Sequence, residues 1–252
     1  MARKIHIPRD SGARSLGAEG TAKAIAAYVN RRGLDFEIVR NGSRGLYWLE
    51  PMVEVDGPGG RIAYGPVAAG DVTGLFDAGF PNAASHHLYI GAVDEIPYLK
   101  DQQRLTCARI GVIDPVSLDD YKAHGGYRGL LRAIEIGPEK IVDEVDASAL
   151  RGRGGAGFPA GIKWRTAMRA AGEKKYIACN ADEGDSGTFA DRMIMEGDPF
   201  VLLEVMTVGG IAVGADEGFI YIRSEYPDSY QVLGEAVKAA RERGYLGDNV
   251  LG

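Results

Sequence analysis

The residue types best suited to chemistry lie in one stretch, Leu150–Trp164, whose sequence is LRGRGGAGFPAGIKW. It holds four glycines within six residues: Gly152, Gly154, Gly155 and Gly157. Glycine adopts backbone conformations that other residues avoid, and it lets a ligand touch the main chain. A basic, helix-forming segment, Lys163–Arg169, follows, and the free N–H groups at a helix N-terminus attract anions. The stretch therefore predicts a pocket in which a flat or phosphorylated cofactor lies against bare backbone.

A flexible loop or a tight turn is the alternative interpretation of these glycines. Three of them have G-x-G-x-x-G spacing, but the dinucleotide-binding fingerprint also requires a strand in front of it. Residues Val142–Leu150 are not a plain apolar strand. The G-x-x-x-x-G-K-[ST] phosphate loop is not matched either, because Ile162 separates the last glycine from the lysine.

A second stretch adds polar groups. Lys174–Asn180 is a short apolar run that predicts a buried strand. It leads into the sequence NADEGDSGT, which contributes Asn180, Asp182, Glu183 and Asp185. In open α/β sheets, ligands bind in the crevice beyond the carboxyl ends of the strands. A solvated acidic loop is the alternative for this stretch alone, but the two stretches together favour a cofactor site.

The motifs LRGRGGAGFPAGIKW and CNADEGDSGTFADR resemble a flavoprotein family that includes the NADH-binding subunit of respiratory complex I. The family also holds the diaphorase subunits of soluble NAD-reducing hydrogenases and of NAD-dependent formate dehydrogenases. The resemblance extends over residues 95–252. It implies that FMN accepts a hydride from NADH, so no side chain has to act as a catalytic acid or nucleophile.

The resemblance also implies roles for residues of the first motif. Bare backbone would let the flavin lie close to three glycines: Gly152, Gly154 and Gly155. Phe158 would offer an aromatic face to the dinucleotide. Lys163 would donate to the flavin ring or its phosphate side and stabilise the anionic reduced form. Arg153, like Arg151, would either bind phosphate or hold the glycine loop by salt bridges.

In the second motif, the resemblance assigns hydrogen bonds with the ring or the ribityl hydroxyls to Asn180, Asp182 and Glu183. Asp185 departs from many complex I relatives, which carry a glutamate implicated in dinucleotide binding. Aspartate keeps the charge but reaches less far. A carboxylate beside the adenosine ribose would repel a 2′-phosphate, so we expect Asp185 to favour NAD over NADP.

Composition narrows the class of protein. A chain of 252 residues suits one large domain or two small ones, and its net charge of −6 argues against nucleic acid as a partner. No run of about 18 apolar residues predicts a membrane span, and the N-terminus has no apolar signal core. We therefore expect no membrane partner and a cytoplasmic location. Cys107 and Cys179 are the two cysteines, too few for an iron–sulfur or zinc site, so we expect no metal in this segment.

Residues 1–95 predict a small separate domain with a β-α-β-β-β-α order. The expected elements are strands at 4–8 and 36–40, a helix at 18–30, a hairpin of 47–55 with 61–64, and a helix at 71–78. This order is similar to a thioredoxin-like fold, which carries a [2Fe-2S] cluster in some relatives. No cysteine precedes Cys107, so we expect a docking module without a cluster.

The rest of the chain predicts a linker and helical lead-in, 96–148, and then a Rossmann-like α/β domain, 149–252. Helices are expected near 117–124, 130–136, 138–146, 191–197, 199–213 and 230–243, with a second strand at 218–223. In the helix 199–213, an apolar stripe predicts the core-facing side: Val201, Leu202, Val205, Val208 and Ile211. The overall expectation is a parallel α/β sheet.

Segments at Asn41–Gly45 and Trp48–Pro51 are similar to formate dehydrogenase β chains. The leading interpretation is therefore the N-terminal part of the diaphorase subunit of an NAD-dependent formate dehydrogenase. It implies two partners, a small thioredoxin-like [2Fe-2S] subunit and a larger molybdenum-containing catalytic subunit, and a [4Fe-4S] cluster in a C-terminal continuation. The segment alone should bind flavin weakly. A hydrogenase diaphorase, a complex I subunit and a non-catalytic docking scaffold are the alternatives.

Overall fold

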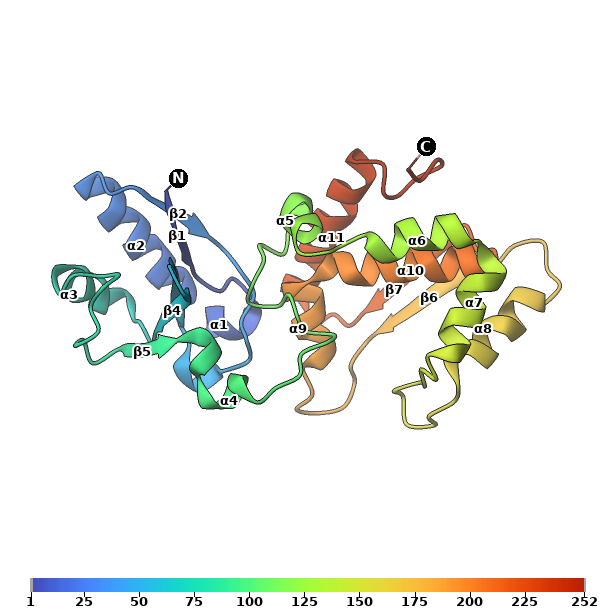
Figure 1. Cartoon of the computed structure of the whole chain (residues 1–252), viewed down its shortest axis with the longest axis horizontal. Helices are drawn as coiled ribbons and strands as arrows, with labels where there is room; N and C mark the ends of the chain where they lie inside the picture. Colours follow the sequence, from blue (N-terminus) through green and yellow to red (C-terminus); the bar gives the residue numbers. More distant parts are fainter. Residues whose placement is uncertain (1, 252) are drawn as a thin grey trace. The chain divides into compact units, whose positions relative to one another are not determined.

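The computed structural model describes residues 2–251 and divides into two compact units (Figure 1). The first unit comprises the chain up to Asp120 together with Met193–Asp198. The second comprises Tyr121–Arg192 together with the chain from Pro199 onward. Two helices run across these boundaries, α5 (Leu118–Ala123) and α9 (Ala190–Gly197).

A five-stranded sheet in the order β2-β1-β3-β4-β5 forms the framework of the first unit. β1 and β2 are parallel, and the remaining neighbours are antiparallel. The strands are β1 (Arg3–His6), β2 (Phe36–Val39), β3 (Val53–Gly57), β4 (Gly60–Tyr64) and β5 (Tyr89–Ala92). The helices are α1 (Ser11–Ser15), α2 (Ala18–Arg32), α3 (Val72–Asp77) and α4 (Pro97–Lys100), with 3-10 turns at Tyr47–Leu49, Ala69–Asp71 and Val93–Glu95. A βαβ unit followed by a ββα unit is the thioredoxin-like arrangement, which confirms the predicted fold.

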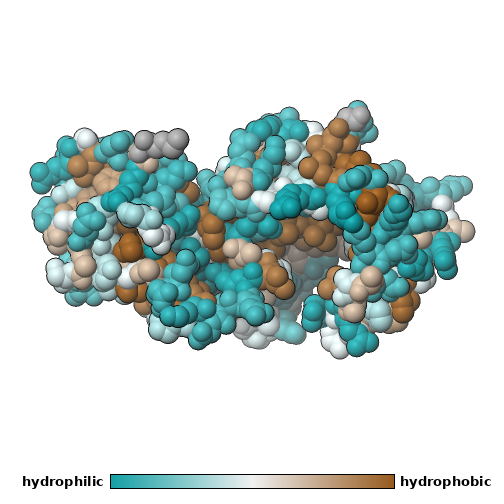
Figure 2. All heavy atoms as spheres, viewed as in Figure 1, coloured by the Kyte–Doolittle hydropathy of each residue, from teal (hydrophilic) through white to brown (hydrophobic). Residues whose placement is uncertain are grey.

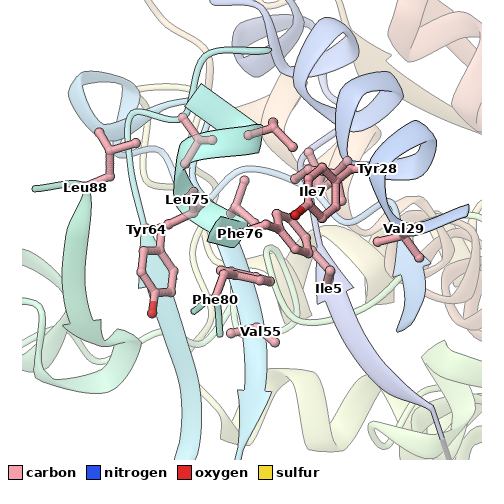
Figure 3. Close-up of a cluster of buried hydrophobic side chains, with 14 of the residues drawn as sticks. Ile5, Ile7, Tyr28, Val29, Val55, Tyr64, Leu75, Phe76, Phe80 and Leu88 are labelled. Atoms are coloured by element: carbon pink, nitrogen blue, oxygen red, sulfur yellow. The ribbon is translucent and has the colours of Figure 1, made fainter. Parts of the chain in front are cut away.

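Helical spacing explains how α2 packs on this sheet. Ala22, Ile25 and Val29 recur on one face of the helix, and all three are buried. α2 ends at Gly33, whose φ of +62° is the left-handed conformation that glycine adopts without strain. Side chains from α2, α3 and the strands converge on one cluster (Figure 3), in which Phe76 and Phe80 lie 4.7 Å apart between ring centroids.

Two expectations for this unit were wrong. The strand predicted at 47–55 begins only at Val53, because the preceding Pro51 has no N–H to donate to a ladder. The hairpin itself forms, with Gly57 paired to Gly60. The short strand β5 was not predicted, since four residues with a central Gly91 carry little strand signal.

The returning segment Met193–Asp198 is fastened inside the first unit. The Glu196 carboxylate accepts the Ser11 backbone N–H at 2.6 Å and its hydroxyl at 3.1 Å. The Asp198 carboxylate is fully buried and accepts a hydrogen bond from Arg109 at 2.8 Å. Gly197 fits because a Cβ there would lie 2.7 Å from the Ile110 side chain.

The second unit is built around two parallel strands, β6 (Tyr176–Ala181) and β7 (Glu217–Ile222), and the long helix α10 (Pro199–Val213) that connects and covers them (Figure 1). Its other helices are α6 (Arg128–Ile136), α7 (Pro138–Ala147), α8 (Ala160–Arg169) and α11 (Pro227–Glu242). These elements confirm the predicted α/β order. Among the described residues, no helix combines the length and the apolar character that crossing a membrane requires.

A buried carboxylate ties α10 to the start of α6. Glu204 accepts hydrogen bonds from the Tyr121 hydroxyl at 2.5 Å, from the Tyr127 N–H at 2.7 Å and from the Leu130 N–H at 2.9 Å. Gly126 is required beside this group, because a Cβ there would collide with the Tyr121 ring. The predicted helix boundary at Gly125-Gly126 thus coincides with a packing constraint.

The burial expected for α10 was correct only in part, since Val208 and Ile211 pack against the core cluster that contains Ala212. Val205 is 52% exposed, and the other four residues of the predicted stripe are only half-buried. The buried positions are Pro199, Phe200, Leu203, Glu204, Gly209, Gly210, Ala212 and Val213. Because α10 is apolar on almost every face, its sequence pattern does not distinguish the covered side.

The strand β6 is also less buried than predicted. Its residues alternate between exposed and covered, and the exposed face of the two strands carries Tyr176, Phe219 and Tyr221 at 52%, 55% and 66% exposure. α10 covers the opposite face, where Ile177 packs into a cluster with Trp164 and Ala212. Figure 2 shows brown patches of hydrophobic residues among hydrophilic ones on the face that it displays.

Candidate functional site

The glycine loop is a closed turn between α7 and α8. Arg151 and Pro159 form an antiparallel bridge. The Gly152 N–H donates to the Phe158 carbonyl at 2.8 Å, and the Ala160 N–H donates to the Leu150 carbonyl at 2.8 Å. α8 begins directly after this bridge, so the prediction of a loop that feeds a helix N-terminus is confirmed.

The glycines of this stretch are needed for different reasons. Gly155 and Gly157 have φ values of +96° and +60°, which favour glycine. Gly161 allows α7 and α8 to pack, because a Cβ would lie 2.5 Å from the Asp146 Cα. Gly154 meets neither requirement: its φ is not positive, and an added Cβ has no heavy atom within 4 Å among the described residues. Its missing side chain leaves main chain open to a ligand.

A cavity of about 460 Å³ opens on this loop. Its size is typical of small-molecule sites. The lining residues are Leu150, Arg151, Gly152, Arg153, Gly154, Ala156, Gly157, Phe158, Ala160, Lys163 and Trp164. Of the residues predicted from the first motif, all line the cavity except Gly155. Phe158 is 54% exposed and presents its ring.

Trp164 lines this cavity although no feature of the sequence had assigned it a role there. It also packs against α10, where its ring lies 3.7 Å from the position of a Cβ on Gly209. The position of Trp164 early in α8, directly after the glycine loop, is the sequence signal that could have identified it. Trp164 therefore joins the cavity wall to the core of the second unit.

The residues of the second motif do not line the cavity. Asn180 lies near the end of β6, and its side-chain oxygen accepts the Asp182 N–H at 3.2 Å. Asp185 belongs to a turn in which its carbonyl accepts the Thr188 N–H at 3.2 Å and the Thr188 hydroxyl at 2.7 Å. The structure thus places these side chains at or just beyond the carboxyl end of a parallel strand, as predicted.

Glu183 has a different position from its neighbours. Its φ is +48°, and its carboxylate accepts the N–H groups of Asp191 at 2.7 Å and Arg192 at 3.0 Å, in the first turn of α9. The Tyr226 hydroxyl donates to the same carboxylate at 3.1 Å. Burial, followed by the Glu183 charge, raises the pKa of Asp191.

Other polar groups of the unit have structural surroundings. The Arg223 side chain donates to the Glu183 carbonyl at 2.9 Å, and its hydrogen bond with Glu225 raises the pKa of the Arg223 guanidinium. Burial raises the pKa of the Cys179 thiol, which keeps it protonated as a half-buried residue of β6. Within residues 2–251, no group of three or more His, Cys, Asp or Glu side chains is arranged to hold a metal ion.

This arrangement fits a flavin nucleotide. The open main chain at Gly154 admits a planar ring, Phe158 offers an aromatic face, and Arg151, Arg153 and Lys163 bring three cations to one cavity for a phosphate. The N-terminal end of α8 at the same place adds the favourable end of a helix dipole for an anion.

Comparison with known proteins agrees with this assignment. The family model described as "Nuo51 FMN-binding domain" matches residues 145–250. The NADP-reducing hydrogenase subunit HndC of Solidesulfovibrio fructosivorans is 50% identical over 153 residues, which cover 61% of this chain and 31% of the relative. An NADH-quinone oxidoreductase subunit of Aquifex aeolicus (strain VF5) is 50% identical over 136 residues, which cover 54% of this chain and 32% of the relative.

The chain thus spans about a third of the length of these curated relatives. Among solved structures, the NAD+-reducing [NiFe]-hydrogenase in the air-oxidized state aligns over 96% of this chain and 41% of its own, with a TM-score of 0.45 and 21% identity. The glycine loop and the acidic loop both fall inside residues 145–250, the range that matches the model of the Nuo51 FMN-binding domain.

Proposed function

We propose that the chain is the flavin-binding part of an NADH:acceptor oxidoreductase, a diaphorase module that joins NAD(H) to one-electron carriers. The open main chain at Gly154 is the observation that carries this proposal. Neither packing nor backbone conformation within the described chain requires glycine there, and the residue lines the cavity together with Arg153, Phe158 and Lys163, where a cofactor would contact its main chain.

The residues divide the work of holding FMN and NAD(H). Main chain at Gly152 and Gly154 admits the ring, while Phe158 stacks on the dinucleotide. Lys163 and Arg153 neutralise the phosphate or the reduced ring. Asn180, near the end of β6, and Asp182 and Asp185, in the loop that follows, supply polar groups. When bound, FMN supplies hydride exchange with NADH and single-electron transfer onward. The protein positions the rings.

For the parent complex we propose an NAD-dependent formate dehydrogenase of the cytoplasm. The basis is the similarity of Asn41–Gly45 and Trp48–Pro51 to such β chains. Its partners would be a thioredoxin-like [2Fe-2S] subunit and a molybdenum-containing catalytic subunit, with a [4Fe-4S] cluster in chain beyond this segment. A hydrogenase complex is the second candidate, because a relative named as a hydrogenase subunit is 50% identical over 153 residues.

The visible absorbance spectrum of the purified native complex tests the proposal. Flavin bands that bleach when NADH is added without oxygen would support it. A spectrum without flavin, or a flavin that does not respond to NADH, would favour a docking scaffold. Formate and hydrogen, added separately in place of NADH, would then identify the partner chemistry.

A further inference from the structure

We propose that Tyr226 and Arg223 are positioning residues for the acidic loop that act through Glu183, and that Glu183 anchors this loop rather than contacting the cofactor. This inference rests on the proposed function, since it concerns how the loop at residues 182–188 is held. Tyr226 and Arg223 lie just beyond β7, and the loop lies just beyond its parallel neighbour β6.

The geometry of Glu183 shows that its carboxylate is engaged inside the protein. Three donors surround it: the N–H groups of Asp191 and Arg192, and the Tyr226 hydroxyl. A carboxylate that accepts two N–H groups of a first helical turn replaces the usual capping residue of that helix. Such a group has little capacity left for a flavin or a ribityl hydroxyl.

The backbone of Glu183 supports the same conclusion. A left-handed φ of +48° at a residue other than glycine is unfavourable. Glycine would remove that cost, so the side chain is what this position requires. The Arg223 guanidinium holds the strained residue from its other side by donating to the Glu183 carbonyl at 2.9 Å.

Tyr226 is itself fixed in place. Two guanidinium groups lie near its ring, with Arg223 at 5.3 Å and Arg192 at 5.9 Å from the ring centroid. Burial and the hydrogen bond to Glu183 raise the pKa of Tyr226. The phenol therefore keeps its proton, and its role as a donor, throughout the neutral range.

The consequence concerns the side chains on either side of Glu183. Asp182 and Asp185 belong to the same short loop, whose backbone position is set by the anchored Glu183 between them. Tyr226 and Arg223 thereby connect the end of β7 to the placement of two carboxylates proposed to meet the ribityl chain and the dinucleotide.

The test compares Tyr226→Phe, Glu183→Ala and Glu183→Gln with a matched control, Tyr230→Phe, in the complete protein. Tyr230 is 73% exposed on α11, so its variant makes the same chemical change away from the loop. Hydrogen exchange at the Asp191 and Arg192 amides reports the anchor, and titration with FMN reports binding. From the loss of one hydrogen bond to a carboxylate, Tyr226→Phe should speed exchange and weaken FMN binding by about fivefold each.

Glu183→Ala should show larger changes in both measurements, and Glu183→Gln should restore part of each because glutamine retains an acceptor oxygen. For Tyr226→Phe, turnover per bound flavin should stay within about twofold of the parent. Unchanged exchange with weaker FMN binding would mean that Glu183 contacts the cofactor directly, and would overturn the proposal. Faster exchange with unchanged FMN binding would also overturn it, since the network would then be structural only.

The two proposals fail in different ways. A parent protein that neither binds FMN nor responds to NADH would refute the proposed function. A parent that binds FMN, with variants that match it in both measurements, would refute only the positioning role. If Tyr226→Phe does not fold, Arg223→Lys tests the same anchor, because lysine keeps the charge but loses the guanidinium geometry.

Discussion

Replacing Gly154 with alanine tests whether the main chain of the glycine loop contacts the flavin. The φ of Gly154 is not positive, and an added Cβ has no heavy atom within 4 Å among residues 2–251. The variant should therefore fold with a free energy of unfolding within about 1 kcal/mol of the parent. Any change should be stabilising, because alanine restricts the unfolded chain.

The effect on FMN binding should be larger. The new methyl group extends about 1.5 Å from the Cα, so a ring packed on the main chain has to move by about 1 Å. A gap of that size removes between roughly a quarter and a half of the dispersion energy at the contact. We expect about tenfold weaker binding, which corresponds to about 1.4 kcal/mol.

Gly161→Ala provides the opposite pattern as a control. Its Cβ would lie 2.5 Å from the Asp146 Cα, so the helices α7 and α8 would be overpacked. The expected loss of stability is about 1–3 kcal/mol. FMN titration by flavin fluorescence and urea unfolding measure both quantities. If Gly154→Ala binds FMN with the Kd of the parent, the flavin does not lie on this main chain and the reasoning is refuted.

Three further changes have defined outcomes. Glu204→Ala leaves the Tyr121 hydroxyl and two backbone N–H groups without their acceptor, so urea unfolding should show a loss of about 3 kcal/mol or more; a loss below about 1 kcal/mol would contradict the burial of that group. Burial raises the pKa of Glu50 to about 7 from its ordinary value of 4.5. Because the folded state binds the Glu50 proton more tightly than the unfolded state does, this group stabilises the protein fully below about pH 4.5. That stabilisation is lost as the pH rises through about 7. Compared with Glu50→Gln, the parent should lose up to about 3 kcal/mol between pH 4 and pH 8, measured as the difference in Tm between the two proteins, and parallel Tm profiles would contradict the raised pKa. Asp185→Asn should raise NADPH turnover relative to NADH, and an unchanged ratio would remove Asp185 from the adenosine ribose.

The parts of this fold that were predictable are those in which a local pattern has one solution. α2 has apolar residues on one face and Gly33 at its end, and the structure contains that helix with two more residues. The surroundings of the glycine loop were also predictable, because its φ values, its bridge at Arg151 and its cavity all depend on residues within one stretch of fifteen.

The parts that were not predictable depend on partners distant in sequence. Glu183 has the residue type of a cofactor ligand, but its carboxylate oxygens accept hydrogen bonds from donors eight, nine and 43 residues away in the sequence. The prediction of the buried face of α10 was correct only in part for a related reason. A helix that is apolar on every side has no preferred face until its neighbours are known. The burial of Glu204 could not be predicted from the sequence. A buried carboxylate is favourable here only because the N–H groups of Tyr127 and Leu130, distant in sequence, donate to it.

The fastening of Met193–Asp198 inside the first unit has a consequence for folding on the ribosome. A domain built from one continuous segment is complete as soon as its last residue emerges, and N-terminal domains commonly fold first. Here Ser11 and Arg109 find their acceptors, Glu196 and Asp198, only after the whole of the glycine loop and the acidic loop has been synthesised. We therefore expect the first unit to complete its packing only after residues 193–198 have been synthesised, and not as soon as Asp120 has emerged.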